Sequence, residues 1–144
     1  MIALRSSILL LAVLALGACD DDDDPVQPRT LVCGAVLEDA DGAGTEIETD
    51  ATGDALFAIV GTEMEWEVNS TGIDDFSAAH IHRENGSILV PGVGSFTLDE
   101  TGSGSGTMTV TEDQVDIIEA GGTFFNVHTD TYTGGEISGD LVCE

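Results

Sequence analysis

One stretch of six residues restricts the fold more than any other part of the chain. Acidic and apolar side chains alternate without interruption from Glu63 to Val68, so that Met64, Trp66 and Val68 fall on one side and three glutamates on the other. Because successive side chains of a β-strand point to opposite faces of its sheet, this alternation predicts a strand with one buried and one solvent-facing side.

Turn signals divide the rest of the domain into short segments. Further strands are predicted at 31–37, 54–60, 76–83, 88–93, 95–98, 106–110, 123–129 and 135–143. The segment 54–60 is apolar almost throughout, which predicts a well-buried strand. The stretch 38–53 is rich in Asp, Gly and Thr, and we expect it to be a loop that contains a short strand at 45–48.

A single short helix is expected among these strands. Residues 111–114 read Thr-Glu-Asp-Gln, which has the form of a capping box, and Gly121-Gly122 is the expected stop signal. No long amphipathic helix is present that would cover a parallel sheet. Seven to nine short strands with one small helix indicate an all-β fold, an antiparallel Greek-key β-sandwich.

The first 18 residues are predicted to be a signal peptide rather than part of the fold. Arg5 precedes an apolar run from 8 to 16, which is too short for a permanent span of about 20 residues. Residues 16–19 read Leu-Gly-Ala-Cys and resemble the bacterial lipobox, whose cysteine is acylated and becomes the first residue of the mature protein. The resemblance implies a palmitate-type lipid anchor on Cys19, which holds the protein to a membrane of the cell envelope, at the periplasmic face or the cell surface. An ordinary secretory signal followed by a chance cysteine is the alternative.

Residues 19–29 are expected to be an extended tether. Five consecutive aspartates, 20–24, repel one another and are followed by Pro-Val-Gln-Pro. The remaining segment, 30–144, is long enough for one domain with one core.

The charge of the chain limits its partners. It contains 28 acidic and three basic residues, and Arg5 is lost with the signal peptide. A surface of this charge repels the phosphates of nucleic acids, so nucleic-acid binding is excluded. The expected partner is instead a protein or a surface ligand whose identity the sequence does not reveal.

Cys33 and Cys143 remain for the domain once Cys19 carries the lipid. Thiols outside the cytoplasm tend to pair, so we expect a disulfide that joins the first and last strands. Two separate buried thiols are the alternative.

The three histidines of the chain are candidate metal ligands. His80 and His82 lie two apart in a predicted strand and share a face, and His128 shares a face with Phe124 and Asn126 in another strand. Three imidazoles on two strands are suited to zinc or copper. The alternative is structural, because strand histidines also bond to backbone carbonyls or carboxylates. No G-x-S-x-G elbow or unpaired nucleophilic cysteine is found, so we do not expect an enzyme.

Three spaced motifs resemble the signatures of the CHRD domain. They are Ala-Ala-His-Ile-His at 78–82, Phe-Asn-Val-His-Thr at 125–129 and Gly-Gly-Glu-Ile-Ser-Gly-Asp-Leu at 134–141. The sequence departs from the family where Arg83 replaces a glycine, Ser138 an arginine and Asp140 a glutamine, and it lacks the proline-containing motif near the first strand. The resemblance implies an extracellular β-sandwich-type domain that is not a known enzyme. Together with the lipobox-like segment and the tether, it favours a lipid-anchored protein whose domain serves binding or structural interaction.

The histidine strands are also similar to two strands of Cu/Zn superoxide dismutase. By position, His80, His82 and His128 match three copper ligands of that family. The bridging histidine, the histidine-rich zinc loop and the active-site arginine have no counterpart, so dismutase activity is not expected. This similarity implies a reduced three-histidine site for copper or zinc.

Overall fold

The structure is a computed structural model that describes residues 27–40, 47–91 and 96–144. The predicted signal peptide, the lipidation residue Cys19 and residues 19–26 of the tether lie outside the described residues.

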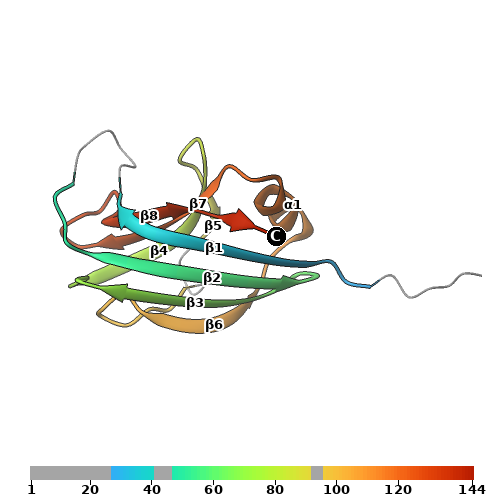
Figure 1. Ribbon diagram of the computed structural model, residues 1–144, viewed down its shortest axis with the longest axis horizontal. Coiled ribbons are helices and arrows are strands. Elements are labelled where there is room, and N and C mark those ends of the chain that lie inside the picture. The colour runs from blue at the N-terminus through green and yellow to red at the C-terminus, as the bar shows by residue number, and fades with distance from the viewer. Residues whose placement is uncertain (1–26, 41–46, 92–95) are drawn as a thin grey trace, which may run out of the picture.

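The described residues form nine strands and one helix (Figure 1). In chain order they are β1 Thr30–Asp39, β2 Thr52–Val60, β3 Glu63–Thr71, β4 Phe76–Arg83, β5 Ile88–Val90, β6 Gly104–Thr109, α1 Glu112–Ala120, β7 Thr123–Thr129, β8 Ile137–Asp140 and β9 Val142–Cys143. The alternating segment that restricts the fold from sequence becomes β3, with Met64, Trp66 and Val68 buried.

The strands form one antiparallel sheet that curls into two layers. Their order is β5-β4-β7-β8-β1-β2-β3-β6, and β9 also pairs with β1. The long strand β1 belongs to both layers, because residues 30–37 pair with β2 and its last two residues pair with β8. Connections from β3 to β4, β5 to β6 and β6 to β7 join strands that are not neighbours in the sheet. The expected all-β sandwich with one short helix is confirmed.

Aromatic rings join the two layers in the core. The ring of Phe57 on β2 lies 5.3 Å from that of Phe125 on β7 and 6.0 Å from that of Phe96, in edge-on contacts. The ring of Trp66 packs 5.5 Å from Phe96. These rings are buried, so the two layers share a single core.

Several predicted strands differ from the structure. The segment 54–60 is not buried on both faces, because Leu56 and Val60 point outward and are each 49% exposed. The segment 96–98 buries Phe96 and Leu98 but forms no strand, since its backbone joins no ladder. Residues 47–48 are likewise not a strand, whereas 45–46 lie outside the described residues.

Two other predicted strands have different bounds in the structure. The strand expected at 88–93 ends at Val90, and the next residue is Pro91, which has no N–H to donate. The segment 135–143 divides into β8 and β9. Strand β8 lies between β7 and the end of β1, whereas β9 pairs with β1 at Cys33 and Gly34. The sequence pattern of 135–143 does not reveal that its two halves have different pairing partners.

Helix α1 forms where the capping box predicts it. The Thr111 hydroxyl accepts from the Gln114 N–H, the Gln114 side chain accepts from the Thr111 N–H, and Gly121 ends the helix. Val115 and Ile118 are its buried residues. Among the described residues, no helix has the length and apolarity needed to cross a membrane.

The structure joins Cys33 and Cys143 by a disulfide, as expected. The two residues lie directly opposite each other on β1 and β9. The bridge closes a loop with a sequence separation of 110 and secures a strand only two residues long.

Replacing both cysteines by alanine is expected to lower the free energy of unfolding by about 2–5 kcal/mol, because the unbridged unfolded chain gains conformational freedom. Urea unfolding of the purified wild-type and C33A/C143A proteins measures the difference. Val142→Ala changes the neighbouring, exposed residue and keeps the bridge, so its effect should stay below about 0.5 kcal/mol. Equal stability of the wild-type and doubly substituted proteins would contradict a stabilising bridge.

Candidate metal centre

Strands β4 and β7 are antiparallel neighbours, each with an inner and an outer face. Their inward-facing side chains belong to the core and are Ala79, Ile81, Phe125 and Val127. The residues between them point to the outer face, so His80 and His82 of β4 share that face with His128 of β7. The register sets His82 opposite Phe124 and His80 opposite Asn126. Antiparallel pairing thus brings the three histidines together.

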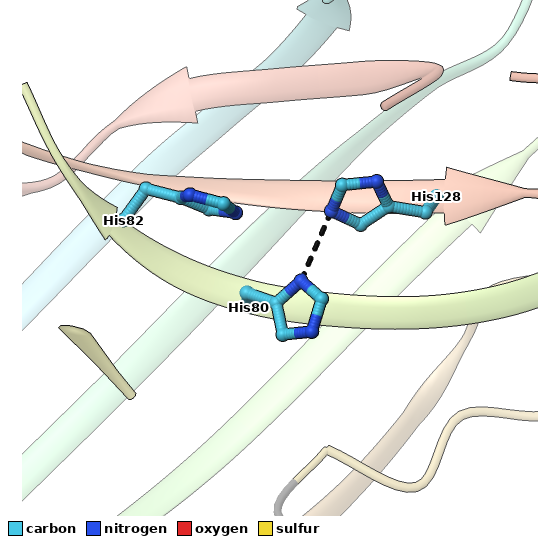
Figure 2. A group of neighbouring side chains, drawn as sticks. All are labelled: His80, His82 and His128. Atoms are coloured by element: carbon cyan, nitrogen blue, oxygen red, sulfur yellow. Dashed lines mark hydrogen bonds between the residues drawn. The ribbon is translucent and has the colours of Figure 1, made fainter. Parts of the chain in front are cut away.

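The three imidazoles are turned toward one another (Figure 2). His80 Nδ1 lies 3.0 Å from His128 Nε2. The ring centroid of His80 lies 5.4 Å from that of His82 and 4.9 Å from that of His128. One ring nitrogen of each histidine can be chosen so that all three atoms lie within 4.8 Å of one another. The sequence-predicted set is therefore one cluster, with His82 and His128 buried and His80 partly exposed.

Two main-chain carbonyls determine the tautomers of the buried histidines. His82 Nδ1 lies 2.9 Å from the Gly86 carbonyl oxygen, and His128 Nδ1 lies 3.0 Å from the Thr133 carbonyl oxygen. A carbonyl only accepts hydrogen bonds, so each Nδ1 carries a proton, and in the neutral imidazole each Nε2 then presents a lone pair. His128 Nε2 accepts the N–H of His80 Nδ1, whereas His82 Nε2 is buried with no hydrogen-bond partner.

The β4–β5 hairpin supplies the first carbonyl. Its turn is closed by hydrogen bonds from the Arg83 N–H to the Ser87 carbonyl and from the Gly86 N–H to the Arg83 carbonyl, both 2.8 Å long. The Arg83 side chain also donates to the Ile88 carbonyl at 3.3 Å. The side chain of Arg83 thus helps to hold the turn whose Gly86 carbonyl bonds to His82. The ring of His82 also stacks on Phe124, with centroids 5.1 Å apart.

The loop before β8 supplies the second carbonyl and is held by a buried carboxylate. Glu136 accepts hydrogen bonds from the hydroxyls of Thr49 and Thr129, each 2.8 Å long. Gly135 has φ +118°, and a side chain there would collide with Asn126. Sequence reasoning did not assign these roles, although Gly135 and Glu136 belong to the third motif. In the structure, these two residues support the loop whose Thr133 carbonyl bonds to His128.

Burial keeps two of the imidazoles neutral. It is the main cause that lowers the pKa of His80, and positive charge on His128 or His82 would lower that pKa further. Burial also lowers the pKa of His128, although the hydrogen bond to the Thr133 carbonyl acts in the opposite direction. Within the described part of the chain, no carboxylate forms an ion pair with a histidine. The lowered pKa values favour the neutral form of His80 and His128, which is the form of histidine that metals bind.

Comparison with protein families identifies the domain. The family model of the CHRD domain matches residues 34–141, a range that contains all three histidines and the supporting loops. The chain therefore belongs to the CHRD domain family. A comparison with curated proteins finds no match.

The stability of the domain is expected to fall as the pH drops below about 6.5. The unfolded chain takes up protons on His80 and His128 at a higher pH than the folded chain does, since folding lowers both pKa values. The slope is at most about 1.4 kcal/mol per pH unit for each proton taken up on unfolding.

Urea unfolding at pH values between neutral and about 5.5, above the range of ordinary carboxylates, measures this fall. The H80Q/H128Q variant keeps hydrogen-bonding side chains but does not titrate there, so its stability should depend less on pH. An equal dependence in both proteins would show that other groups cause it.

Proposed function

We propose that this CHRD domain binds one copper or zinc ion through His80, His82 and His128. The observation that carries the proposal is the cluster itself, in which three imidazole nitrogens from two strands lie within 4.8 Å of one another. Hydrogen bonds from Nδ1 to main-chain carbonyls orient two of these rings. Metal-binding histidines in proteins are commonly held in this way through their second nitrogen.

The spacing of one nitrogen pair is close to what such an ion requires, and all three nitrogens lie within 4.8 Å of one another. Bonds of about 2.0–2.1 Å in tetrahedral geometry separate neighbouring nitrogens by roughly 3.3 Å. His80 Nδ1 and His128 Nε2 are already 3.0 Å apart. A metal ion would take the place of the proton between them, and the proton of His80 Nδ1 would move to Nε2 of the same ring through solvent. His82 Nε2, which is buried without a partner, would then gain one.

The ligand set favours particular metals. It consists of three imidazole nitrogens, which suit copper and zinc, whereas calcium and magnesium prefer several oxygen ligands. Three protein ligands leave a fourth position for water or a small ligand. No ionised carboxylate is paired with the histidines in the described residues to act as a base, so the arrangement favours binding rather than turnover.

We also propose that the protein acts outside the cytoplasm, anchored by a lipid on Cys19. Support comes from the lipobox-like segment 16–19, the apolar run before it and the acidic tether after it. A bridge between Cys33 and Cys143 agrees with an oxidising compartment. Such a location would expose the histidine cluster to metal ions from the surroundings.

Metal binding is tested by loading the purified, metal-free protein with Zn²⁺ or Cu²⁺ and measuring bound metal after desalting. We expect one ion per chain, and at least about tenfold weaker binding in H80Q and H128Q, since even partners outside the ligand set change affinity by that much. Titration calorimetry measures the affinity.

The matched control is Glu65→Gln, which removes one exposed carboxylate from another strand and should leave the affinity unchanged. Binding of Ca²⁺ reports attraction to the acidic surface alone. Zinc and copper affinities that are equal in the wild-type protein and in both histidine variants would refute the site.

Lipidation is tested by labelling bacterial cells that produce the full chain with palmitate. The wild-type protein should carry the label and fractionate with membranes, whereas Cys19→Ser should lose both properties because the acylated thiol is absent. Cys143→Ser is the matched control and should stay labelled. An unlabelled wild-type protein would refute the anchor without affecting the proposed metal site.

A further inference from the structure

The outer face of the first layer carries an unusual number of exposed apolar side chains. Six large apolar residues are at least 43% exposed among the described residues, and five of them lie on β1, β2 and β9. These five are Val32, Val36, Leu56, Val60 and Val142, with exposed fractions of 43, 71, 49, 49 and 70%. The sixth, Ile88, lies on β5 in the other layer.

Strand register places these side chains on one surface, which we call the β1–β2 face. Gly34 on β1 lies opposite Leu56 of β2 on one side and opposite Val142 of β9 on the other. Val32 and Val36 lie two residues before and after Gly34, so they share its face. Figure 1 shows β1 and β2 as adjacent long strands. Gly34 leaves a gap in its centre, since a Cβ there would meet only the Ala55 carbonyl oxygen, at 3.9 Å.

A row of glutamates borders the β1–β2 face. Glu63, Glu65 and Glu67 of β3 lie opposite Val60, Ala58 and Leu56 of β2, and therefore point to the same side. Neither of the two arginines in the described residues pairs with them. Arg29 forms ion pairs with Asp116 and Glu119 of α1, and Arg83 bonds within the β4–β5 hairpin. The face is thus apolar along one side and negatively charged along the other.

A hollow of about 370 Å³ lies where the two rows meet. Leu56 and Ala58 contribute apolar surface to it, and Glu65 and Glu67 contribute carboxylates. A lysine or arginine side chain has the matching chemistry, because its aliphatic stem packs on apolar surface while its charged end meets a carboxylate.

We propose that the β1–β2 face is a docking surface for a basic, apolar polypeptide segment of another protein. Its apolar side chains pack on Val32, Val36 and Leu56, and its lysine or arginine side chains reach the glutamates of β3. Charge complementarity selects this occupant. A second copy of the chain brings the same excess of acidic residues, and an anionic membrane surface repels the glutamates. The surface is on a different layer from the histidine cluster, so it is independent of metal binding.

The test uses synthetic peptides of about ten residues, the length of β1. One alternates Lys and Val, a second alternates Lys and Ser, and a third alternates Glu and Val. Fluorescence anisotropy measures binding to the purified protein at low and high ionic strength. The Lys–Val peptide is expected to bind at least about tenfold more tightly than the Lys–Ser peptide, because only it buries apolar surface. The Glu–Val peptide is expected not to bind, and added salt should weaken Lys–Val binding.

Variants separate the apolar contribution from the charge. V36S/L56S keeps every charge and should reduce the preference for Lys–Val over Lys–Ser to less than about threefold. E65Q/E67Q should reduce the salt dependence. Gly34→Lys places a cation in the central gap, where there is room, and should abolish binding. Ile88→Ser is the matched control on the other layer and should bind as the wild type does.

Three results would overturn the proposal. Equal affinity for the Lys–Val and Lys–Ser peptides would show that charge alone attracts them. Wild-type affinity in V36S/L56S would place the contact elsewhere. A dimer in analytical ultracentrifugation that V36S/L56S dissociates would assign the face to a second copy. The H80Q/H128Q variant should bind the peptide normally, which keeps this test separate from that of the metal site.

Discussion

The pairing of β1 with strands of both layers is the interaction on which the rest of the structure depends. Its first eight residues pair with β2, and its last two pair with β8. The crossing requires close contact between backbones, because a side chain at Gly139 would collide with the Val36 carbonyl. Strand β8 in turn pairs with β7, which carries His128. One strand thus connects the exposed β1–β2 face to the layer that holds the histidines, and the disulfide at Cys33 secures the same strand to β9.

The histidine cluster is organised from outside its two strands. Antiparallel pairing of β4 and β7 brings the rings together, but pairing alone does not determine which nitrogen of each ring carries the proton. Hydrogen bonds to the Gly86 and Thr133 carbonyls place that proton on Nδ1 of His82 and His128. Both carbonyls belong to turns that are themselves bonded in place, one by Arg83 and the other within a loop anchored by Glu136. Preorganisation of this kind reduces the cost of ordering ligands when a metal binds.

The distribution of charge separates the two surfaces for which we propose binding. The chain is strongly acidic, yet the three histidines have no ion-paired carboxylate in the described residues, and burial lowers the pKa of two of them. Carboxylates do line the outer side of β3, where they border exposed apolar side chains. Neutral nitrogen ligands suit copper or zinc, whereas the mixed apolar and acidic face suits a basic polypeptide. One small sandwich can therefore offer two different binding chemistries on its two layers.

Local pattern was sufficient for the features that depend on neighbours in sequence. Alternation predicted β3 and the shared face of His80 and His82, and the capping box predicted α1, because strand periodicity and helix capping operate over a few residues. Among contacts between distant segments, the sequence predicted the Cys33–Cys143 bridge and the three-histidine set, and the tertiary structure decided the others. The sequence did not reveal that Leu56 faces solvent, that 135–143 divides into two strands, or that Thr133 and Gly86 orient the imidazoles. Each of these depends on which strand or loop lies alongside, and long-range packing rather than local propensity determines that.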